Sequence, residues 1–283
     1  MSEYVGRFAP SPTGPLHFGS VIAAAASFLD AKSRGGTWRV RIEDVDEART
    51  EPGAISAILR LLEALGMEWD GEVVLQSRRK ALYREALAAL SSETFGCSCT
   101  RRELSGIYPG TCRSGARGDA RTVRLKVPDL DIGFDDLVQG RQGQNLARDV
   151  GDFVLLRADG FFAYQLAVVV DDIEQGVNHV VRGADLLDST PRQIRLWRLL
   201  GKDPPVYAHL PVAVNPAGEK LSKQTKAEPA SAGTDVLFRA LQCLGQAPPE
   251  TLARAGTKEF WQWALPAWDI GKVPKRKTIQ ETA

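Results

Sequence analysis

The chain has 283 residues, of which 43% are hydrophobic and 25% charged, and its formal net charge is +1. This composition is typical of a globular protein with an ordinary core, and it excludes a disordered or fibrous chain. No apolar run is long enough to span a membrane and no signal peptide is visible, so we expect a cytoplasmic protein without a membrane partner. The absence of a heptad pattern favours a monomer over a coiled-coil dimer.

The first ninety residues alternate between strand and helix patterns. The predicted elements are strands at 4–8, 37–43 and 73–75 and helices at 17–34, 52–65 and 78–90. Such alternation predicts an α/β fold with a doubly wound, mostly parallel sheet. Ligands in these sheets bind beyond the carboxyl ends of the strands.

Between about 96 and 150 the composition shifts to Gly, Arg, Cys and short alternating strands, which indicates an inserted β-rich module. The α/β pattern then returns, and the motifs on either side must meet, so this second half completes the sheet. The later predicted elements are strands at 122–127, 132–138 and 178–182 and helices at 164–174, 190–200, 234–244 and 259–265. Three tryptophans near the last helix (Trp261, Trp263, Trp268) are more typical of packing than of base stacking.

Two short segments more than two hundred residues apart predict one ATP site. Residues 10–20 (Pro-Ser-Pro-Thr-Gly-Pro-Leu-His-Phe-Gly-Ser) place small residues directly before an apolar helix, whose first amides favour a phosphate. Residues 220–224 (Lys-Leu-Ser-Lys-Gln) carry two lysines that suit a departing pyrophosphate. Taken singly, His17 is better explained as a capping or core residue, and Lys220 and Lys223 as ordinary surface lysines; it is the combination that favours an ATP site.

These segments resemble the HIGH and KMSKS signatures of class I aminoacyl-tRNA synthetases. Segments 7–14, 41–44, 164–167 and 182–193 are similar to the glutamyl subgroup, in the same chain order. The resemblance implies a Rossmann-type catalytic domain in which His17, Lys220 and Lys223 are catalytic. It also implies ATP contacts from His17, Gly19 and Lys223, with Mg²⁺ bridging the phosphates.

A glutamate site needs two cations for the carboxylates and one anion for the ammonium group. Arg7, Arg182 and Glu43 supply that set, although a salt bridge between Glu43 and either arginine is the structural alternative. The resemblance implies that Arg182 faces the side-chain carboxylate and Glu43 the amino group. The expected glutamate-binding residues are Arg7, Phe8, Ala9, Pro10, Ser11, Glu43, Tyr164 and Arg182. Val168 stands where the subgroup often has Asn, which predicts weaker glutamate binding.

Three cysteines and a tyrosine lie close together in the predicted module, at Cys97, Cys99, Tyr108 and Cys112. Three cysteines in a β-rich insertion more often bind zinc than form a disulfide. The resemblance places Tyr108 as the fourth ligand of one structural Zn²⁺ per chain, an uncommon role because a phenol loses its proton only near pH ~10. The fourth cysteine, Cys243, lies on an apolar helix and is predicted to be core.

Only residues 225 to 283 follow the lysine motif, too few for the anticodon-binding domain of a glutamyl-tRNA synthetase, so none is expected. The predicted domains are 1–96 and 151–215 for the catalytic halves, 97–150 for the zinc module and 216–283 for the lysine loop and C-terminal helices. A shortened glutamyl enzyme with this cysteine set resembles the glutamyl-Q tRNA(Asp) synthetases.

That resemblance implies ATP-dependent, tRNA-independent formation of glutamyl-adenylate. Glutamate is then transferred to the queuosine base at the wobble position of tRNA(Asp). Arginines at 101, 102, 113, 117, 121 and 124 and a basic segment at 272–277 are candidate phosphate contacts, with a solvated surface as the alternative. Two other functions stay open, a truncated synthetase that charges a tRNA 3′ end and a non-catalytic tRNA-binding relic.

Overall fold

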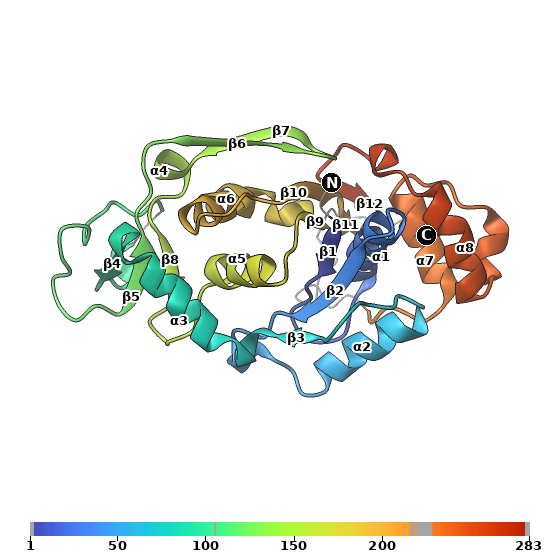
Figure 1. The fold of residues 1–283 in the computed structure, drawn as a ribbon, viewed down its shortest axis with the longest axis horizontal. Coiled ribbons are helices and arrows are strands. Elements are labelled where there is room, and N and C mark those ends of the chain that lie inside the picture. The colour runs from blue at the N-terminus through green and yellow to red at the C-terminus, as the bar shows by residue number, and fades with distance from the viewer. Residues whose placement is uncertain (1–2, 105, 216–217, 219–227, 281–283) are drawn as a thin grey trace.

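The computed structural model describes residues 3–104, 106–215, 218 and 228–280. Parallel strands flanked by helices form its centre (Figure 1). β1 (Val5–Phe8) pairs in parallel with β2 (Thr37–Ile42), which pairs in parallel with β3 (Val74–Leu75). The predicted parallel α/β architecture of the first half is therefore confirmed.

Two helices connect these strands. α1 (Phe18–Lys32) links β1 to β2, and α2 (Ala54–Ala64) lies between β2 and β3. α1 is largely buried, because its alanine-rich face packs directly on β1. The helix predicted to begin at Pro52 begins instead at Ala54, since Gly53 precedes it with φ at 78°, outside the helical region.

The second half of the domain continues the parallel arrangement. β9 (His179–Gly183) lies beside β1, where the amide of Asn178 donates to the carbonyl of Val5 at 3.0 Å, and it pairs in parallel with β10 (Val206–Leu210). α5 (Tyr164–Glu174) and α6 (Thr190–Leu199) pack against each other on this half. The strands therefore lie in the order β3, β2, β1, β9, β10. The carboxyl ends of strands from both predicted halves lie at the same edge of this arrangement.

A long hairpin extends this group of strands. β6 (Asp131–Asp136) and β7 (Gly140–Asn145) are antiparallel, and β6 meets β10 in parallel where Tyr207 faces Asp136. Figure 1 shows the hairpin running above α6 to reach β10. We predicted a strand here but assigned it to the inserted module, because alternation identifies a strand and not its partner.

A second, antiparallel sheet consists of β4 (Thr94–Cys97), β5 (Thr122–Leu125) and β8 (Phe153–Leu156), in the order β4-β5-β8. Its outer strands therefore begin before and end after the predicted 97–150 module. α3 (Lys80–Ala89) leads into this sheet, and the short α4 (Leu146–Asp149) follows the hairpin.

The C-terminal helices pack on the first half of the domain (Figure 1). α7 (Thr234–Cys243) and α8 (Thr257–Ala267) contact α1, and β12 (Thr278–Gln280) pairs in parallel with β11 (Val212–Val214). The indole of Trp261 donates to the carbonyl of Leu65 at 2.8 Å, and Trp268 donates to Asp30. These contacts confirm the predicted packing role of Trp261 and Trp268, and Cys243 is buried as predicted. Among the described residues, no helix combines the length and apolarity needed to cross a bilayer.

Candidate active site

A pocket of about 680 Å³ opens at the carboxyl ends of β1, β2 and β9. All of the expected glutamate-binding residues line it, and so does His17. Gly19 is not among the lining residues, and Lys220 and Lys223 lie outside the described residues. The first sequence motif and the distant arginine, tyrosine and glutamate positions therefore meet at one cavity.

His17 is the N-cap of α1. Its backbone is extended, and its Nδ1 accepts a hydrogen bond from the amide of Ser20 at 3.3 Å. His17 therefore caps the helix, as the structural alternative proposed, and its side chain also lines the pocket. The segment after the lysine motif returns to this point, since the amide of Ala230 donates to Leu16 and Pro229 forms a bridge with His17.

Arg7 and Arg41 share one buried carboxylate. Arg7 Nε lies 3.2 Å from Asp172 Oδ1, and Arg41 Nη1 lies 2.7 Å from the same oxygen. Burial raises the pKa of Asp172, but the two guanidinium groups outweigh it and the net pKa is lowered. Asp172 is thus an anion that holds Arg7 in the pocket wall.

Glu43 pairs with Arg41 at 3.4 Å, which is neither of the two arginines considered in the sequence. Its side chain is largely buried, and burial raises its pKa against the opposing attraction of Arg41 and Arg7. A carboxylate in this position gains stability from a bound cation.

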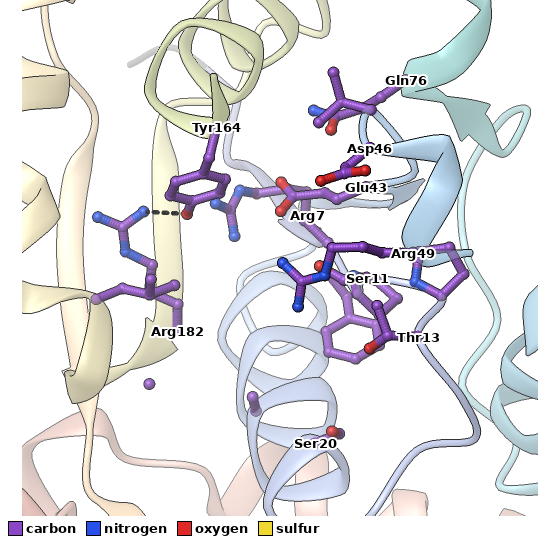
Figure 2. A pocket seen from close by; sticks show the side chains of 18 of the residues that line it. Arg7, Ser11, Thr13, Ser20, Glu43, Asp46, Arg49, Gln76, Tyr164 and Arg182 are labelled. Atoms are coloured by element: carbon purple, nitrogen blue, oxygen red, sulfur yellow. Dashed lines mark hydrogen bonds between the residues drawn. The ribbon is translucent and has the colours of Figure 1, made fainter. Parts of the chain in front are cut away.

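Arg182 is 5% exposed and is held by three neutral partners. Its Nε donates to His209 Nε2 at 3.0 Å, Nη2 to Thr190 Oγ1 at 2.9 Å, and Nη1 to the hydroxyl of Tyr164 at 3.4 Å. The last contact is drawn in Figure 2, with Tyr164 between Arg182 and Glu43. In the described part of the chain no carboxylate forms an ion pair with Arg182, so this buried cation suits an anionic ligand.

His209 was not predicted, and it fixes Arg182 from behind. Its Nδ1 lies 2.6 Å from Asp136 Oδ2, and both side chains are fully buried. Because Nε2 accepts from Arg182, the ring proton resides on Nδ1 and is donated to Asp136. Burial lowers the pKa of His209, and the positive charge of Arg182 lowers it further against the pull of Asp136.

The predicted metal ligands form a cluster in the antiparallel sheet region. The sulfur atoms of Cys97, Cys99 and Cys112 all lie within 4.8 Å of one another, and the hydroxyl of Tyr108 lies 3.5 Å from Cys97 Sγ. Burial raises the pKa of Tyr108, so ligation would require the metal to displace its proton. Three thiols and one phenol would supply the four donors of a tetrahedral zinc site. Zinc binding stays a prediction.

Two of the clustered arginines have a structural role. Arg113 donates twice to the buried carboxylate of Asp152, at 2.6 and 2.5 Å, and Arg124 donates to the carbonyl of the same residue at 2.8 Å. Arg124 also lies over the ring of Tyr108 at 4.2 Å. Arg102, Arg117 and Arg121 are exposed.

Other residues of the pocket wall were also missed. They include Val45, Asp46, Arg49, Thr50, Gln76, Arg157 and Phe162, from the segments after β2, β3 and β8. Arg157 Nη1 lies 2.6 Å from Asp46 Oδ2, and both side chains line the cavity. A polar residue directly after a predicted strand was the one available signal, and it applied to Gln76.

The sequence matches the catalytic domain of class I tRNA synthetases (E and Q) over residues 3–108 and 110–242. It is 55% identical to the glutamyl-Q tRNA(Asp) synthetase of Dechloromonas aromatica (strain RCB), over 98% of each chain. It is 52% identical to the protein of that name from Thiobacillus denitrificans, over 99% of this chain and 98% of the other.

The fold is similar to that of a glutamate tRNA ligase from Elizabethkingia meningosepticum, solved in complex with its amino acid. That match has a TM-score of 0.83 and 26% identity, and it covers 100% of this chain and 68% of the other. The predicted class I catalytic fold is therefore confirmed.

Proposed function

The chain belongs to the glutamyl-Q tRNA(Asp) synthetases, ligases with a class I catalytic domain, and we propose that it activates glutamate with ATP without needing tRNA. The activated glutamate is then transferred to the queuosine base at the wobble position of tRNA(Asp). The observation that carries glutamate recognition is Arg182, a buried cation in the pocket wall with three neutral partners and no carboxylate partner among the described residues.

In the first step a carboxylate oxygen of glutamate attacks the α-phosphorus of ATP, and pyrophosphate leaves. Arg182 binds the side-chain carboxylate, Arg7 helps to hold the other carboxylate, and Glu43 attracts the ammonium group. His17 donates to a phosphate oxygen at the start of α1, where helix amides favour negative charge. Gly19, which has no side chain, leaves room at the start of α1 for the nucleotide, and Lys220 and Lys223 stabilise the departing pyrophosphate. Mg²⁺ bound with ATP would neutralise charge on the phosphates.

In the second step a hydroxyl of the queuosine cyclopentene ring attacks the activated carbonyl, and AMP leaves with the bonding electron pair. The hydroxyl proton passes to solvent or to the released phosphate. Proximity of the two groups accounts for most of the acceleration, so no dedicated base is invoked. The exposed arginines of the cysteine module are the proposed contacts for tRNA phosphates, and zinc on Cys97, Cys99, Tyr108 and Cys112 would hold that module in shape.

The test uses labelled glutamate, ATP and tRNA(Asp), with and without queuosine, each also prepared without its 3′-terminal adenosine. We expect label on every queuosine-bearing sample, including the one that lacks the 3′ adenosine. Label that requires the 3′ adenosine would instead identify a truncated glutamyl-tRNA synthetase. No label on any sample, together with no ATP–pyrophosphate exchange, would indicate a non-catalytic relic. Exchange measured without tRNA decides whether activation is tRNA-independent.

A further inference from the structure

Gln76 lies at the carboxyl end of β3, beside Glu43 at the end of β2. The parallel register pairs Ile42 with Leu75, so the next residues along the two strands are Glu43 and Gln76. Gln76 lines the pocket although its exposed fraction is 0%. Figure 2 shows it on the same side of the cavity as Glu43 and Asp46, opposite Arg182.

The orientation of the Gln76 amide is fixed by its partner. Nε2 lies 2.7 Å from Asp171 Oδ2, and an ionised carboxylate only accepts hydrogen bonds, so the NH₂ group must face Asp171. Asp171 is fully buried and is itself held by Arg79 Nε at 2.6 Å and by the hydroxyl of Tyr83 at 2.7 Å. A flipped amide would set two acceptors against each other, so Oε1 faces away from Asp171.

Oε1 of Gln76 is buried and makes no hydrogen bond to any described residue. Among the described residues of the pocket wall, Thr50 is the other one with such an atom, its Oγ1. A hydroxyl rotates and can donate or accept, whereas the fixed amide oxygen of Gln76 can only accept. A buried acceptor without a donor is unfavourable, so a ligand that donates a hydrogen bond to Oε1 would remove this cost.

The neighbouring groups indicate which donor it receives. Glu43 and Asp46 are the carboxylates on this side of the pocket, where Glu43 lies 3.4 Å from Arg41 and Asp46 lies 2.6 Å from Arg157. Arg182, on the opposite side, has no carboxylate partner among the described residues and suits a carboxylate of the substrate. An acceptor among carboxylates suits a cationic donor. The ammonium group is the cationic part of the proposed substrate.

We propose that Gln76 Oε1 accepts a hydrogen bond from the α-ammonium group of bound glutamate, next to Glu43. This inference rests on the proposed function and adds a binding residue to it. Glu43 supplies the charge, and Gln76, anchored on Asp171, supplies the direction. A dicarboxylate without an amino group would leave Oε1 unpaired and would be discriminated against.

The test compares Gln76→Met with Tyr83→Phe as a matched control. Both variants remove one hydrogen bond to Asp171, but Tyr83 does not line the pocket. Glutamate KM and ATP KM are measured by ATP–pyrophosphate exchange, and the inhibition constant of glutarate, which has both carboxylates and no amino group, is measured alongside. For Gln76→Met we expect glutamate KM to rise about tenfold or more, consistent with a lost bond to a charged group, with glutarate inhibition and ATP KM nearly unchanged. Tyr83→Phe should leave all three values near those of the wild type.

Three results would overturn the proposal. These are an unchanged glutamate KM in Gln76→Met, an equal loss of glutamate and glutarate binding, or the same glutamate defect in Tyr83→Phe. A wild-type protein that exchanges no pyrophosphate would refute the proposed function instead. Calorimetric titration of glutamate and glutarate into the same variants would then still decide the role of Gln76.

Discussion

His209 accepts a hydrogen bond from Arg182 on its Nε2, at 3.0 Å, while its Nδ1 lies 2.6 Å from Asp136. The three residues come from β10, β9 and the end of β6, and all are buried. A neutral imidazole is required at this point, because a protonated ring would place two cations in contact. The orientation of the proposed carboxylate-binding arginine therefore depends on His209.

Replacing His209 by Leu should raise glutamate KM about tenfold, since Arg182 loses one of its three partners and its fixed orientation. ATP KM should stay near the wild-type value, because His209 does not line the pocket. The His209→Gln variant keeps an acceptor and should recover part of the loss. ATP–pyrophosphate exchange measures the glutamate KM and the ATP KM of both variants. A wild-type glutamate KM in His209→Leu would show that Arg182 is positioned without the imidazole ring.

Stability should fall on acidification because of the same histidine. The folded-state pKa of His209 is lowered, so below its ordinary value near ~6.5 the unfolded chain binds the proton first. The contribution of His209 to the free energy of unfolding is complete above that pH, and it is lost as the pH falls toward the lowered pKa of the folded state. The urea midpoint of the wild type should therefore drop more between pH 7.5 and 5.5 than that of His209→Gln. Both proteins retain His17 and His179, so equal drops would exclude His209 as the cause.

The Arg182→Gln variant should lose glutamate activation by roughly a hundredfold, as expected for a lost bidentate or charged contact of about 3 kcal/mol. ATP binding should change little, because Arg182 is the proposed contact for the side-chain carboxylate of glutamate, and Figure 2 shows it across the pocket from Glu43 and Asp46. Exchange kinetics at varied glutamate and ATP separate the two. Equal losses for both substrates would indicate a folding defect, which thermal unfolding of the variant would reveal.

The Lys223→Ala variant should slow adenylate formation on the order of a hundredfold, the effect of removing one transition-state donor. ATP–pyrophosphate exchange at varied glutamate gives the maximal rate, which should fall, and glutamate KM, which should stay near the wild-type value and serves as the internal control. Near-normal exchange in this variant would remove Lys223 from the catalytic set.

One zinc per chain should copurify with the protein, and Cys112→Ser should abolish it. The three thiols lie close enough to share one ion, so losing one ligand should also lower the melting temperature by several degrees. Metal analysis and thermal unfolding without chelators give both values, with Cys243→Ser as the control for zinc content because Cys243 lies outside the cluster. Less than one zinc per two wild-type chains would contradict the assignment.

The pocket residues that belong to short sequence motifs could be predicted from the sequence. Arg7, Glu43, Tyr164 and Arg182 were identified from motifs that each lie at the end of a strand or the start of a helix, and all four line one cavity. Hydrophobic periodicity likewise indicated most helices, because burial on one face repeats along a helix.

The missed residues depend on pairings between distant segments. Asp136 acts on His209 only because β6 joins β10, and the sequence of the hairpin carries no mark of that partner. Arg41 appeared as part of a motif, but its role in binding Asp172, Glu43 and Gln175 required α5 to lie against β2. Gln76 has an unpaired acceptor only because Asp171 fixes its amide.

The contact between Arg7 and Asp172 spans 165 positions of the chain, and it constrains how the protein is made. During synthesis the first 160 residues emerge with Arg7 and Arg41 still lacking their shared carboxylate. Contacts between such distant segments form after local ones, so we expect this pair to form late in folding. A nascent chain that ends before α5 should therefore be unable to bind glutamate, and it would expose an unfinished sheet edge to other nascent chains and to chaperones.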